Sequence, residues 1–489
     1  MIPVILLLSV LWSIRIIGNV VSFAHLWWVK EYRWDRMLIH LRTPQGKRIY
    51  ILPWKRPRIS PKSLFLVASS LLCIFAFIFY SGLPALVAFG IADVASFPLT
   101  FVLVGMINMP VAGYHWYVIA RARRMLRAHT PLTVVGITGS YGKTSTKDYV
   151  STIVSAAYKT LKTAASKNAP IGISEVVISA LRPDHDVFVV EMGAYKPGEI
   201  AFMSKLVRPE IAIITAINEQ HQDLFGTIEN TMKAKYELIA NLTGRRIAIL
   251  NADDTRVRIM GTWAKRDGVT VWWYGTKQNV PKGAKNFRAT DIGTDSHGIY
   301  FTCVCGAQKK RVTAPVIGTH QVQNILASVA AAVAVGMPFE DALHGVSHLV
   351  PAPHVLERIP GIDGMTLIDD SFNNNPDAAK AALDVLALGS PKRVLVFQPM
   401  IELGSYAVSA HEDVGAYAAG MCDAIVLTNA NWEADFLRGV RRVNTKIPVT
   451  VAHGAKAALY IRTFVSGGGT VLGKGKESAG VLRLLRKEP

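Results

Sequence analysis

The sequence predicts an α/β protein that is preceded by a membrane region, and three observations carry this prediction. Long uncharged apolar segments fill the first part of the chain. From residue 129 onward, short apolar runs alternate with helix-like stretches, which is typical of a mostly parallel sheet. A second series of such runs follows residue 349. We therefore expect a membrane region over 1–128, a central α/β domain over 129–348 and a C-terminal α/β domain over 349–489.

The membrane region is predicted from three apolar segments near 2–28, 63–83 and 94–119, because about 20 apolar residues suffice to cross a bilayer. Residues 2–28 contain one charge, Arg15, and residues 63–92 contain none. Segments this long and uncharged are rare in soluble cores, which argues against a buried helical domain as the alternative. The first segment has no basic start and no small-residue cleavage site, so a removable signal peptide is not expected.

The distribution of charge gives the expected orientation. Up to residue 130 the chain holds 15 Lys/Arg and 3 Asp/Glu, whereas the remainder holds 39 and 32. The excess lies in the loop 29–62 and directly after the third segment, at Arg121, Arg123, Arg124 and Arg127. Because basic loops stay on the cytoplasmic side, we expect three crossings of a bacterial cytoplasmic membrane, with the N-terminus outside and both α/β domains in the cytoplasm. Asp93 is expected near the outer turn between the second and third segments.

The basic membrane region also indicates the class of partner. Positive charge beside apolar segments suits the surface of an anionic membrane, so membrane lipids are the expected partners of the loop 29–62. No module that combines aromatic and basic residues for nucleic-acid binding is visible, and we expect no nucleic acid partner.

A strand, a glycine-rich turn and the start of a helix are predicted in "VVGITGSYGKTSTKDYV", residues 134–150. Gly139 and Gly142 allow backbone N–H groups to converge on phosphate oxygens, and the helix adds its positive N-terminal end. Lys143 can reach the outer phosphates, and Thr144 offers a hydroxyl to Mg²⁺. The alternative is a glycine-rich turn that happens to hold a lysine, but the flanking strand and helix favour a nucleotide site. The central part is therefore predicted to be a P-loop ATPase domain.

Polar residues follow several of the predicted strands, where ligands collect in parallel sheets. Glu191 follows "VFVV", His221 lies in "TAINEQHQDLFG" and Lys235 lies in "MKAKYELI". Taken singly, Glu191 would be a helix cap and His221 a satisfied core residue. Together with Thr144, these side chains form a set rich in oxygen and nitrogen that suits Mg²⁺.

From about residue 131 to its end, the chain resembles the Mur ligase family. The resemblance rests on separated motifs: "GITGSYGKTSTK", "EMGAYKPGEI", "HQDLFGTIENTMKAKYELI", "LNADD", "GTHQVQNILASVAAA", "LIDDSFNNNPDAAKAAL", "IELG" and "GKGKES". It is closest to the members that add D-alanyl-D-alanine to a muramoyl-peptide precursor. The resemblance implies a Rossmann-like C-terminal domain and an ATP-dependent amide ligase of peptidoglycan synthesis that works through an acyl phosphate. It also implies two substrates, a peptidyl acceptor and an amino acid or dipeptide.

The resemblance assigns roles to individual positions. It implies nucleotide contacts by Gly139, Ser140, Gly142, Lys143, Thr144, Ser145, Asn251, Asn324 and Asp370. It implies one Mg²⁺ held by Thr144 and Glu191 and a second held by His221. A carbamylated Lys235 would support the second ion. The implied catalytic residues are Lys143, Lys235, His221 and Asn373, the last in a loop that closes on the reaction.

Three departures separate the chain from the family pattern. The family's N-terminal uridine-nucleotide domain is missing, and the transmembrane segments stand in its place. His354-Val355 stands where the family has Gly-Arg, and Gln398-Pro399-Met400 stands where it has Gly-Asp-Met. Two alternatives follow: another Mur-type amide ligase with a membrane-linked or polyamide substrate, and a membrane-anchored inactive scaffold. The retained phosphate-loop and metal residues favour ATP chemistry.

Overall fold

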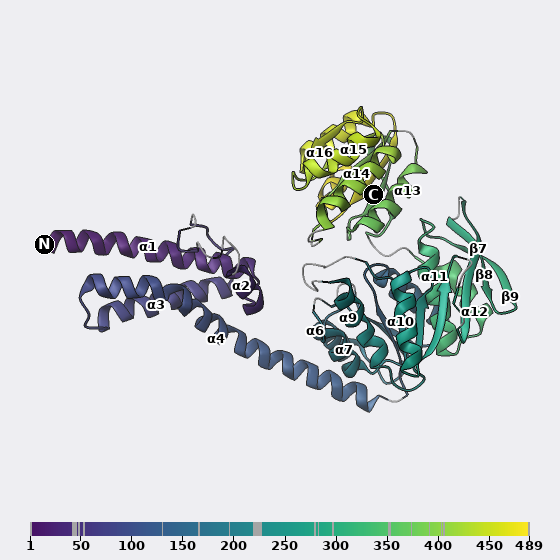
Figure 1. Cartoon of the computed structure of the whole chain (residues 1–489), viewed down its shortest axis with the longest axis horizontal. Coiled ribbons are helices and arrows are strands. Elements are labelled where there is room, and N and C mark those ends of the chain that lie inside the picture. The colour runs from purple at the N-terminus through teal and green to yellow at the C-terminus, as the bar shows by residue number, and fades with distance from the viewer. Residues whose placement is uncertain are drawn as a thin grey trace. The chain divides into compact units, whose positions relative to one another are not determined.

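The computed structural model of the chain describes most of its residues: 2–41, 46, 49–51, 54–129, 131–164, 167–194, 196–218, 227–277, 280–281, 283–295, 298–350, 354–372, 374–390, 392–401, 403 and 406–487. Two of the predicted site residues, His221 and Asn373, lie outside this described part. The chain forms two compact units, Met1–Tyr117 and Val118–Pro489 (Figure 1). Each unit is described separately below.

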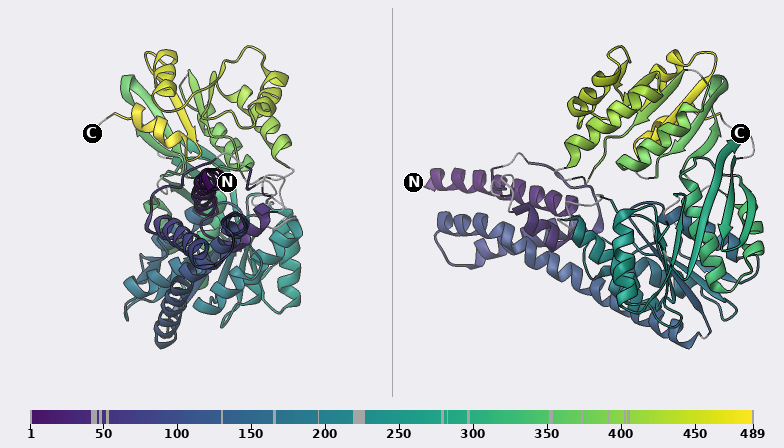
Figure 2. Two further views of the ribbon diagram at one scale, coloured as in Figure 1. Left: turned by 90° about the vertical axis from the view of Figure 1, so that its left-hand side faces the viewer. Right: turned by 45° about the vertical axis from the view of Figure 1, so that its right-hand side comes forward.

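The first unit is helical. It consists of α1 (Ile2–Val29), α2 (Trp34–Leu41), α3 (Pro61–Tyr80) and the first part of α4 (Ala85–Ala128). Helices α1, α3 and the start of α4 run side by side (Figures 1 and 2), and they pack through two apolar clusters around Phe23 and Ile16. Only 22% of the residues in the most apolar stretch of α1, and of α3, are buried. These three helices are therefore long and apolar enough to cross a membrane, and their apolar surface suits a lipid environment.

The structure corrects the prediction for Asp93. Helix α3 ends at Tyr80 and α4 begins at Ala85, so Asp93 lies about two turns inside α4 instead of near the hairpin turn. Its buried carboxylate accepts hydrogen bonds from Arg15 Nε at 2.8 Å and from Asn19 Nδ2 at 2.9 Å. An unpaired carboxylate is costly in an apolar environment. The two hydrogen-bond partners from α1 offset that cost.

The central domain is built on a mixed sheet with the strand order β2-β3-β1-β4-β5-β6-β7-β8-β9. Neighbouring strands from β2 to β7 are parallel, and β8 and β9 add an antiparallel extension. Its strands are β1 (Thr133–Thr138), β2 (Thr160–Lys162), β3 (Val187–Glu191), β4 (Ile211–Ile214), β5 (Ile247–Asn251), β6 (Thr270–Gly275), β7 (Lys285–Asp295), β8 (Gly298–Cys305) and β9 (Gln308–Ala314). Its helices are α5 (Lys143–Val154), α6 (Pro170–Ala180), α7 (Glu199–Val207), α9 (Ile228–Ala240), α10 (Thr255–Arg266), α11 (Gln321–Val335), α12 (Phe339–His344) and a 3₁₀ helix, η2 (Gly345–His348). The mostly parallel central sheet is thus confirmed.

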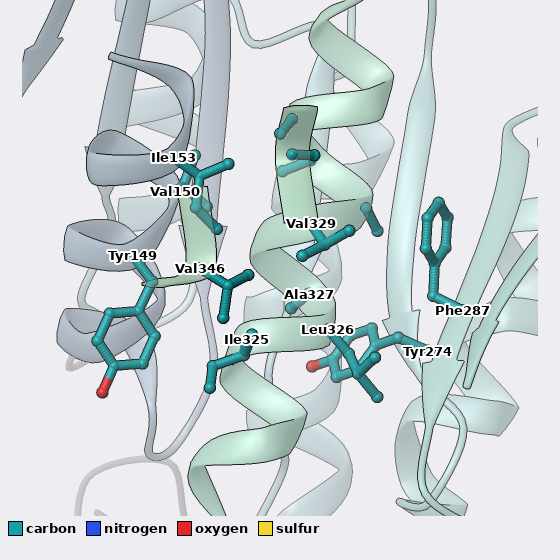
Figure 3. Packing of buried hydrophobic residues seen from close by; sticks show 14 of the residues in the cluster. Tyr149, Val150, Ile153, Tyr274, Phe287, Ile325, Leu326, Ala327, Val329 and Val346 are labelled. Carbon is teal, nitrogen blue, oxygen red and sulfur yellow. The ribbon is translucent and has the colours of Figure 1, made fainter. Parts of the chain in front are cut away.

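Alternate residues of the parallel strands face two separate cores. Val135 and Ile137 of β1 join a cluster with α5 and α11, whereas Val134 joins a cluster with α6, α7, α9 and α10. Figure 3 shows the first cluster, in which Ile153 of α5 and Ile325 of α11 lie among the buried side chains. Strands buried on both faces read as continuous apolar runs, which is why the sequence predicted them. Their carboxyl ends share one edge, and the phosphate loop begins there, directly after β1.

The C-terminal domain repeats this layered design. Its sheet has the order β10-β11-β15-β12-β13-β14, in which β10 is antiparallel to β11 and the other pairs are parallel. Helices cover both faces (Figure 2): α13, α14 and α15 on one, α16 and α17 on the other. Its strands are β10 (Glu357–Pro360), β11 (Met365–Asp370), β12 (Arg393–Phe397), β13 (Ala424–Leu427), β14 (Val449–Val451) and β15 (Gly469–Lys474). Its helices are η3 (Ile362–Gly364), α13 (Pro376–Ala387), α14 (Ala407–Met421), α15 (Glu433–Val443), α16 (Gly454–Phe464) and α17 (Ser478–Leu485). The predicted C-terminal α/β domain is confirmed.

Candidate functional site

Two glycines shape the loop between β1 and α5. Gly139 has a φ of 152° and Gly142 a φ of 78°, a region that residues with a side chain rarely adopt. A Cβ atom at Gly139 would lie 1.9 Å from Thr215 Oγ1, and one at Gly142 would lie 2.6 Å from Asn324 Oδ1. Both positions therefore require glycine.

The end of β4 and the residues after it hold this loop in place. The Ser140 N–H donates to Ala216 O at 2.7 Å, and the Asn218 N–H donates to Ser140 Oγ at 3.0 Å. Thr215 Oγ1 donates to Tyr141 O at 2.5 Å. Three hydrogen bonds thus brace two successive loop residues, Ser140 and Tyr141, and this bracing supplies the preorganisation that a phosphate site needs.

Lys143 is the first residue of α5, and its side chain folds over the loop. Its Nζ atom donates to Gly139 O at 2.8 Å and to Ser140 O at 3.1 Å. Burial lowers the pKa of Lys143, and the nearby Glu191 carboxylate opposes that effect. The lysine therefore lies over the glycine turn, where it can reach the oxygens of a bound phosphate.

Glu191, at the end of β3, forms the oxygen-rich part of the site. Its Oε2 accepts a hydrogen bond from Thr144 Oγ1 at 3.0 Å, and its Oε1 accepts one from Asn168 Nδ2 at 3.2 Å. The carboxylate is almost completely buried. A hydroxyl and a carboxylate side by side are hard oxygen ligands of the kind that Mg²⁺ prefers, so Thr144 and Glu191 fit the predicted ion.

Two polar partners of Glu191 were not predicted from the sequence. Asn168 is one of them, and no periodic signal in "SKNAP" points to it. The other is Lys147, whose Nζ lies 3.7 Å from Glu191 Oε2 and whose side chain is only 1% exposed. Lys147 follows Lys143 by four residues on α5, so that both face the same side of the helix. That spacing was the available signal.

Lys235, on α9, reaches the same loop from the other side. Its buried Nζ donates to Gly139 O at 3.0 Å, so Lys143 and Lys235 share one carbonyl oxygen. Burial lowers the pKa of Lys235 well below its usual range, and the Lys143 ammonium lowers it further. The structure thus brings Lys235 to the loop that holds Lys143, although the two lysines lie far apart in the sequence.

The two asparagines expected to contact the nucleotide, Asn251 and Asn324, also connect to the loop. Asn251 Nδ2 donates to Thr215 O at 2.8 Å, and Thr215 in turn braces the loop. Asn324 Oδ1 accepts a hydrogen bond from Thr146 Oγ1 at 3.3 Å and lies beside Gly142. Neither contact involves a nucleotide, so their proposed nucleotide contacts remain predictions.

In the C-terminal domain, Asp370 and Lys474 form a buried ion pair. Lys474 Nζ lies 2.5 Å from Asp370 Oδ2, at the carboxyl ends of the paired strands β11 and β15. Burial raises the pKa of Asp370, and the Lys474 ammonium opposes that shift. The predicted nucleotide contact by Asp370 would therefore have to coexist with this pair.

The residues that depart from the family pattern have local partners. His354 Nδ1 lies 2.7 Å from Asp369 Oδ2, and the Phe372 N–H donates to His354 O at 3.1 Å. Together with Glu357, His354 and Asp369 offer ligand-type atoms within 4.8 Å of one another. Since the His354 ring is already hydrogen-bonded to Asp369 and is largely exposed, we interpret this group as an ion pair or hydrogen bond that holds the chain against β11. It is not interpreted as a metal centre.

The replaced turn at Gln398 is also built into the C-terminal domain. The Gln398 N–H donates to Lys474 O at 2.9 Å, and Gln398 Oε1 accepts a hydrogen bond from the Glu477 N–H at 3.0 Å. The Met400 N–H donates to Nε2 of the buried His411 at 2.9 Å. The turn therefore joins the ends of β12 and β15 without the aspartate that the family carries.

Comparison with known proteins supports the assignment made from these residues. Residues 137–332 match the family model of the Mur ligase middle domain, and residues 356–477 match that of the Mur ligase, glutamate ligase domain. The chain is 35% identical over 303 residues to the UDP-N-acetylmuramoyl-tripeptide--D-alanyl-D-alanine ligase of Escherichia coli (strain K12), which covers 60% of this chain and 64% of that protein. It is 29% identical to the ligase of the same name from Synechocystis sp., over 74% of this chain and 77% of that one.

Solved structures agree with these matches. Crystal structure I of MurF from Acinetobacter baumannii superposes with a TM-score of 0.68 and 26% identity, over 76% of this chain and 80% of that one. A pseudomurein peptide ligase type C from Methanothermus fervidus shares the fold, with a TM-score of 0.58 and 17% identity. Both domains of the second unit thus have matched family models, and the phosphate loop opens the first of them. The chain belongs to the Mur ligase family.

Proposed function

We propose that this protein is an ATP-dependent amide ligase that joins D-alanyl-D-alanine to a muramoyl-peptide acceptor in peptidoglycan synthesis. The observation that carries the proposal is the convergence of Lys143, Lys235 and the Thr144–Glu191 pair on one braced glycine loop. The names of the relatives from Escherichia coli and Synechocystis support the choice of substrates. The match spans 64% of the Escherichia coli protein, so the substrates are part of the proposal.

The chemistry follows from the poor reactivity of a carboxylate toward an amine. In the proposed reaction, an acceptor carboxylate oxygen attacks the γ-phosphorus of ATP, ADP leaves, and an acyl phosphate forms. The amine nitrogen of D-alanyl-D-alanine then attacks the acyl carbon, loses a proton, and phosphate leaves. Lys143 would move from the loop carbonyls to the phosphate oxygens and stabilise the negative charge that spreads over them.

Thr144 and Glu191 would hold one Mg²⁺, which supplies charge neutralisation at the phosphates when it is bound. We further propose that Lys235 is carbamylated. Its nitrogen would bond to the carbon of CO₂ and release one proton, a step that requires the neutral amine. The lowered pKa of Lys235 supports this requirement, because a buried lysine beside another ammonium is neutral more readily. The second ion, on His221, stays a prediction.

The carbamate has a direct spectroscopic test. Full-length protein equilibrated with ¹³C-bicarbonate is expected to show a carbamate carbon resonance that Lys235→Met lacks. Lys233→Met is a matched control, since Lys233 is an exposed residue of the same helix, α9. A spectrum without the resonance, or one in which Lys235→Met retains it, would contradict the proposal.

One assay tests both the ligase activity and the identity of the substrates, and its outcomes distinguish the two. Detergent-purified full-length protein is incubated with ATP, Mg²⁺, UDP-N-acetylmuramoyl-tripeptide and D-alanyl-D-alanine, and the product is measured by mass spectrometry. We expect an amide product with the mass of both substrates less one water. Phosphate release without that product, on a panel of other acceptors and amines, would identify another amide ligase. Absence of ATP turnover with every substrate would indicate an inactive scaffold.

A second candidate, favoured by the three apolar helices of the first unit, is the same reaction on a membrane-linked acceptor. Tethering at the membrane raises the effective concentration of any substrate confined to that surface. Full-length protein in nanodiscs is offered the soluble and the lipid-linked acceptor at equal concentration. A clear preference for the lipid-linked acceptor supports this candidate, and equal rates remove it.

We also propose that the protein is a multi-pass protein of the bacterial cytoplasmic membrane, with its N-terminus outside and its ligase domains in the cytoplasm. The basic residues that flank the apolar helices support this orientation. A fluorescent protein fused to the C-terminus is expected to fluoresce, and a periplasmic reporter at the N-terminus is expected to be active. Recovery of the full chain in the soluble fraction would exclude the membrane location.

A further inference from the structure

Part of the basic loop of the first unit lies along α1. The Lys55 N–H donates to Ser22 Oγ at 3.0 Å, and His25 Nδ1 lies 2.9 Å from Arg56 O. One turn earlier the Trp54 ring covers Gly18, where a Cβ atom would lie 2.2 Å from the ring. These three α1 residues follow one another at helical spacing on one face, so residues 54–56 are seated on the helix.

A cavity of about 560 Å³ lies at this contact. It is lined by Ile14, Ile17, Gly18 and Val21 of α1 and by Trp54, Lys55 and Arg56 of the loop. The hydrogen bonds that seat the loop use backbone atoms of Lys55 and Arg56, so they consume neither the ammonium nor the guanidinium. The lining is therefore apolar along the helix and positively charged along the loop.

The length of α1 indicates the depth of this cavity in a membrane. Its 28 residues extend over about 42 Å, whereas the hydrocarbon core of a bilayer is about 30 Å thick. Trp28, an exposed residue near its end, suits the membrane–water interface. The basic loop follows this end of α1, so we place the spare length here. Ser22 then lies near the headgroups, and Ile14 to Val21 lie among the acyl chains of the cytoplasmic leaflet.

We propose that this cavity binds one anionic phospholipid of the cytoplasmic leaflet. Its phosphate would lie against Lys55 and Arg56, and an acyl chain would lie along Ile14, Ile17 and Val21. Charge complementarity selects the headgroup, and the apolar helix face accepts the chain. The inference rests on the membrane location proposed above. It goes beyond a general attraction of basic residues to the membrane, because it names a single site.

The test counts bound lipids. Full-length protein is taken from nanodiscs of equal phosphatidylglycerol and phosphatidylcholine and examined by native mass spectrometry. We expect one retained phosphatidylglycerol per chain, with at least a tenfold preference over phosphatidylcholine. The double variant Lys55→Glu/Arg56→Glu is expected to reduce that occupancy at least tenfold.

Matched controls separate a site from diffuse attraction. Arg58→Glu changes the same charge on an exposed residue of the same loop that does not line the cavity, and it should retain the lipid. Ile17→Trp fills the cavity without changing charge and should reduce occupancy, whereas Leu11→Trp, on an exposed part of α1, should not. This second pair keeps the test valid if the double charge variant does not fold.

Three results would overturn the proposal. They are equal retention of both lipids, an equal loss in Arg58→Glu, and displacement of phosphatidylglycerol by a tenfold lower concentration of a polyprenyl phosphate. The last result would assign the site to a different lipid. Membrane fractionation of the same protein tests the location independently, so a failed lipid site is distinguishable from a failed membrane assignment.

Discussion

Two buried lysines, Lys235 in the central domain and Lys474 in the C-terminal domain, occupy comparable depths but different environments. Lys474 is paired with the Asp370 carboxylate at 2.5 Å. Lys235 instead donates to Gly139 O, a carbonyl oxygen that it shares with Lys143. Accordingly, the pKa of Lys235 is lowered well below its usual range, whereas Lys474 has an acidic partner that balances its charge.

The two lysines show that the partners of a buried charge, and not burial alone, set its chemistry. A buried lysine with a carboxylate partner is compensated, and removing either partner leaves a charge without compensation. A buried lysine whose partners among the described residues are a carbonyl and another ammonium is electrostatically unfavourable as a cation. Such a group gains when an anion arrives or when it loses its proton, which is the condition expected at a phosphate or carbamate site.

The largest expected effect is on the lysine of the glycine loop. Lys143→Ala should reduce phosphate release on the order of a thousandfold or more, because it removes a positive charge at a transferring phosphoryl group. The measurement is ATP turnover with saturating substrates. Lys159→Ala, which removes an exposed lysine paired with Asp184, should keep normal turnover. Near-normal activity in Lys143→Ala would refute the assignment of this loop.

Breaking the buried ion pair between Asp370 and Lys474 should lower the stability of the fold. Asp370→Asn leaves the buried Lys474 ammonium without its partner and should cost about 3–5 kcal/mol. Thermal unfolding of the full-length protein should show a lower midpoint. The double variant Asp370→Asn/Lys474→Met should recover part of the loss, since neither charge then remains. If the double variant is as unstable as the single one, the pair is not what stabilises this edge of the sheet.

Replacing Lys235, which lacks a carboxylate partner among the described residues, should increase the stability of the fold instead of lowering it. In bicarbonate-free buffer, where the lysine carries no carbamate, Lys235→Met should raise the midpoint of thermal unfolding near pH 7. With bicarbonate present, the same variant should lower ligase activity by about a hundredfold or more. With a lowered folded-state pKa, the lysine destabilises the fold most below that pKa, and the penalty disappears as pH rises toward 10.5. The stability difference between variant and wild type should therefore shrink with increasing pH.

Two controls test whether the effects of replacing Lys235 come from its carbamate and its burial. Short carboxylates added to Lys235→Ala should restore part of the activity if a carbamate is normally present. Lys233→Met, on the exposed side of α9, should change neither activity nor the pH dependence of unfolding. If a variant at Lys235 is less stable than wild type at neutral pH, the charge of the lysine is balanced in the folded protein.

The smallest expected effect concerns the orientation of Glu191. Asn168→Ala removes the hydrogen bond to Glu191 Oε1 and should raise the Mg²⁺ concentration for half-maximal rate about tenfold. The rate at saturating Mg²⁺ should change little, because the metal ligands themselves remain. The readout is the Mg²⁺ dependence of phosphate release. An unchanged dependence would show that Thr144 and Lys147 suffice to hold the carboxylate.

Much of the fold was predictable because its signals are local. Buried parallel strands read as apolar runs, and the glycine spacing in "GSYGKTS" predicted a turn before a helix. The predictions for Lys143, Thr144, Glu191 and Lys235 agree with the geometry in that all four gather at one loop, although their roles await experiment. Asn168 and the brace formed by Thr215 gave no comparable signal, since their importance depends on which residues lie opposite them.

The layered α/β architecture, the three apolar helices and the position of the glycine loop could be predicted from local patterns, because periodicity and backbone freedom act over a few neighbouring residues. Tertiary structure decided which charges are compensated. Asp93 was expected near a turn but lies in α4, where Arg15 and Asn19 donate hydrogen bonds to it. Lys474 is paired with a carboxylate, whereas no carboxylate among the described residues pairs with Lys235. Electrostatic energy depends on distance and burial, and neither can be read from the spacing of residues along the chain.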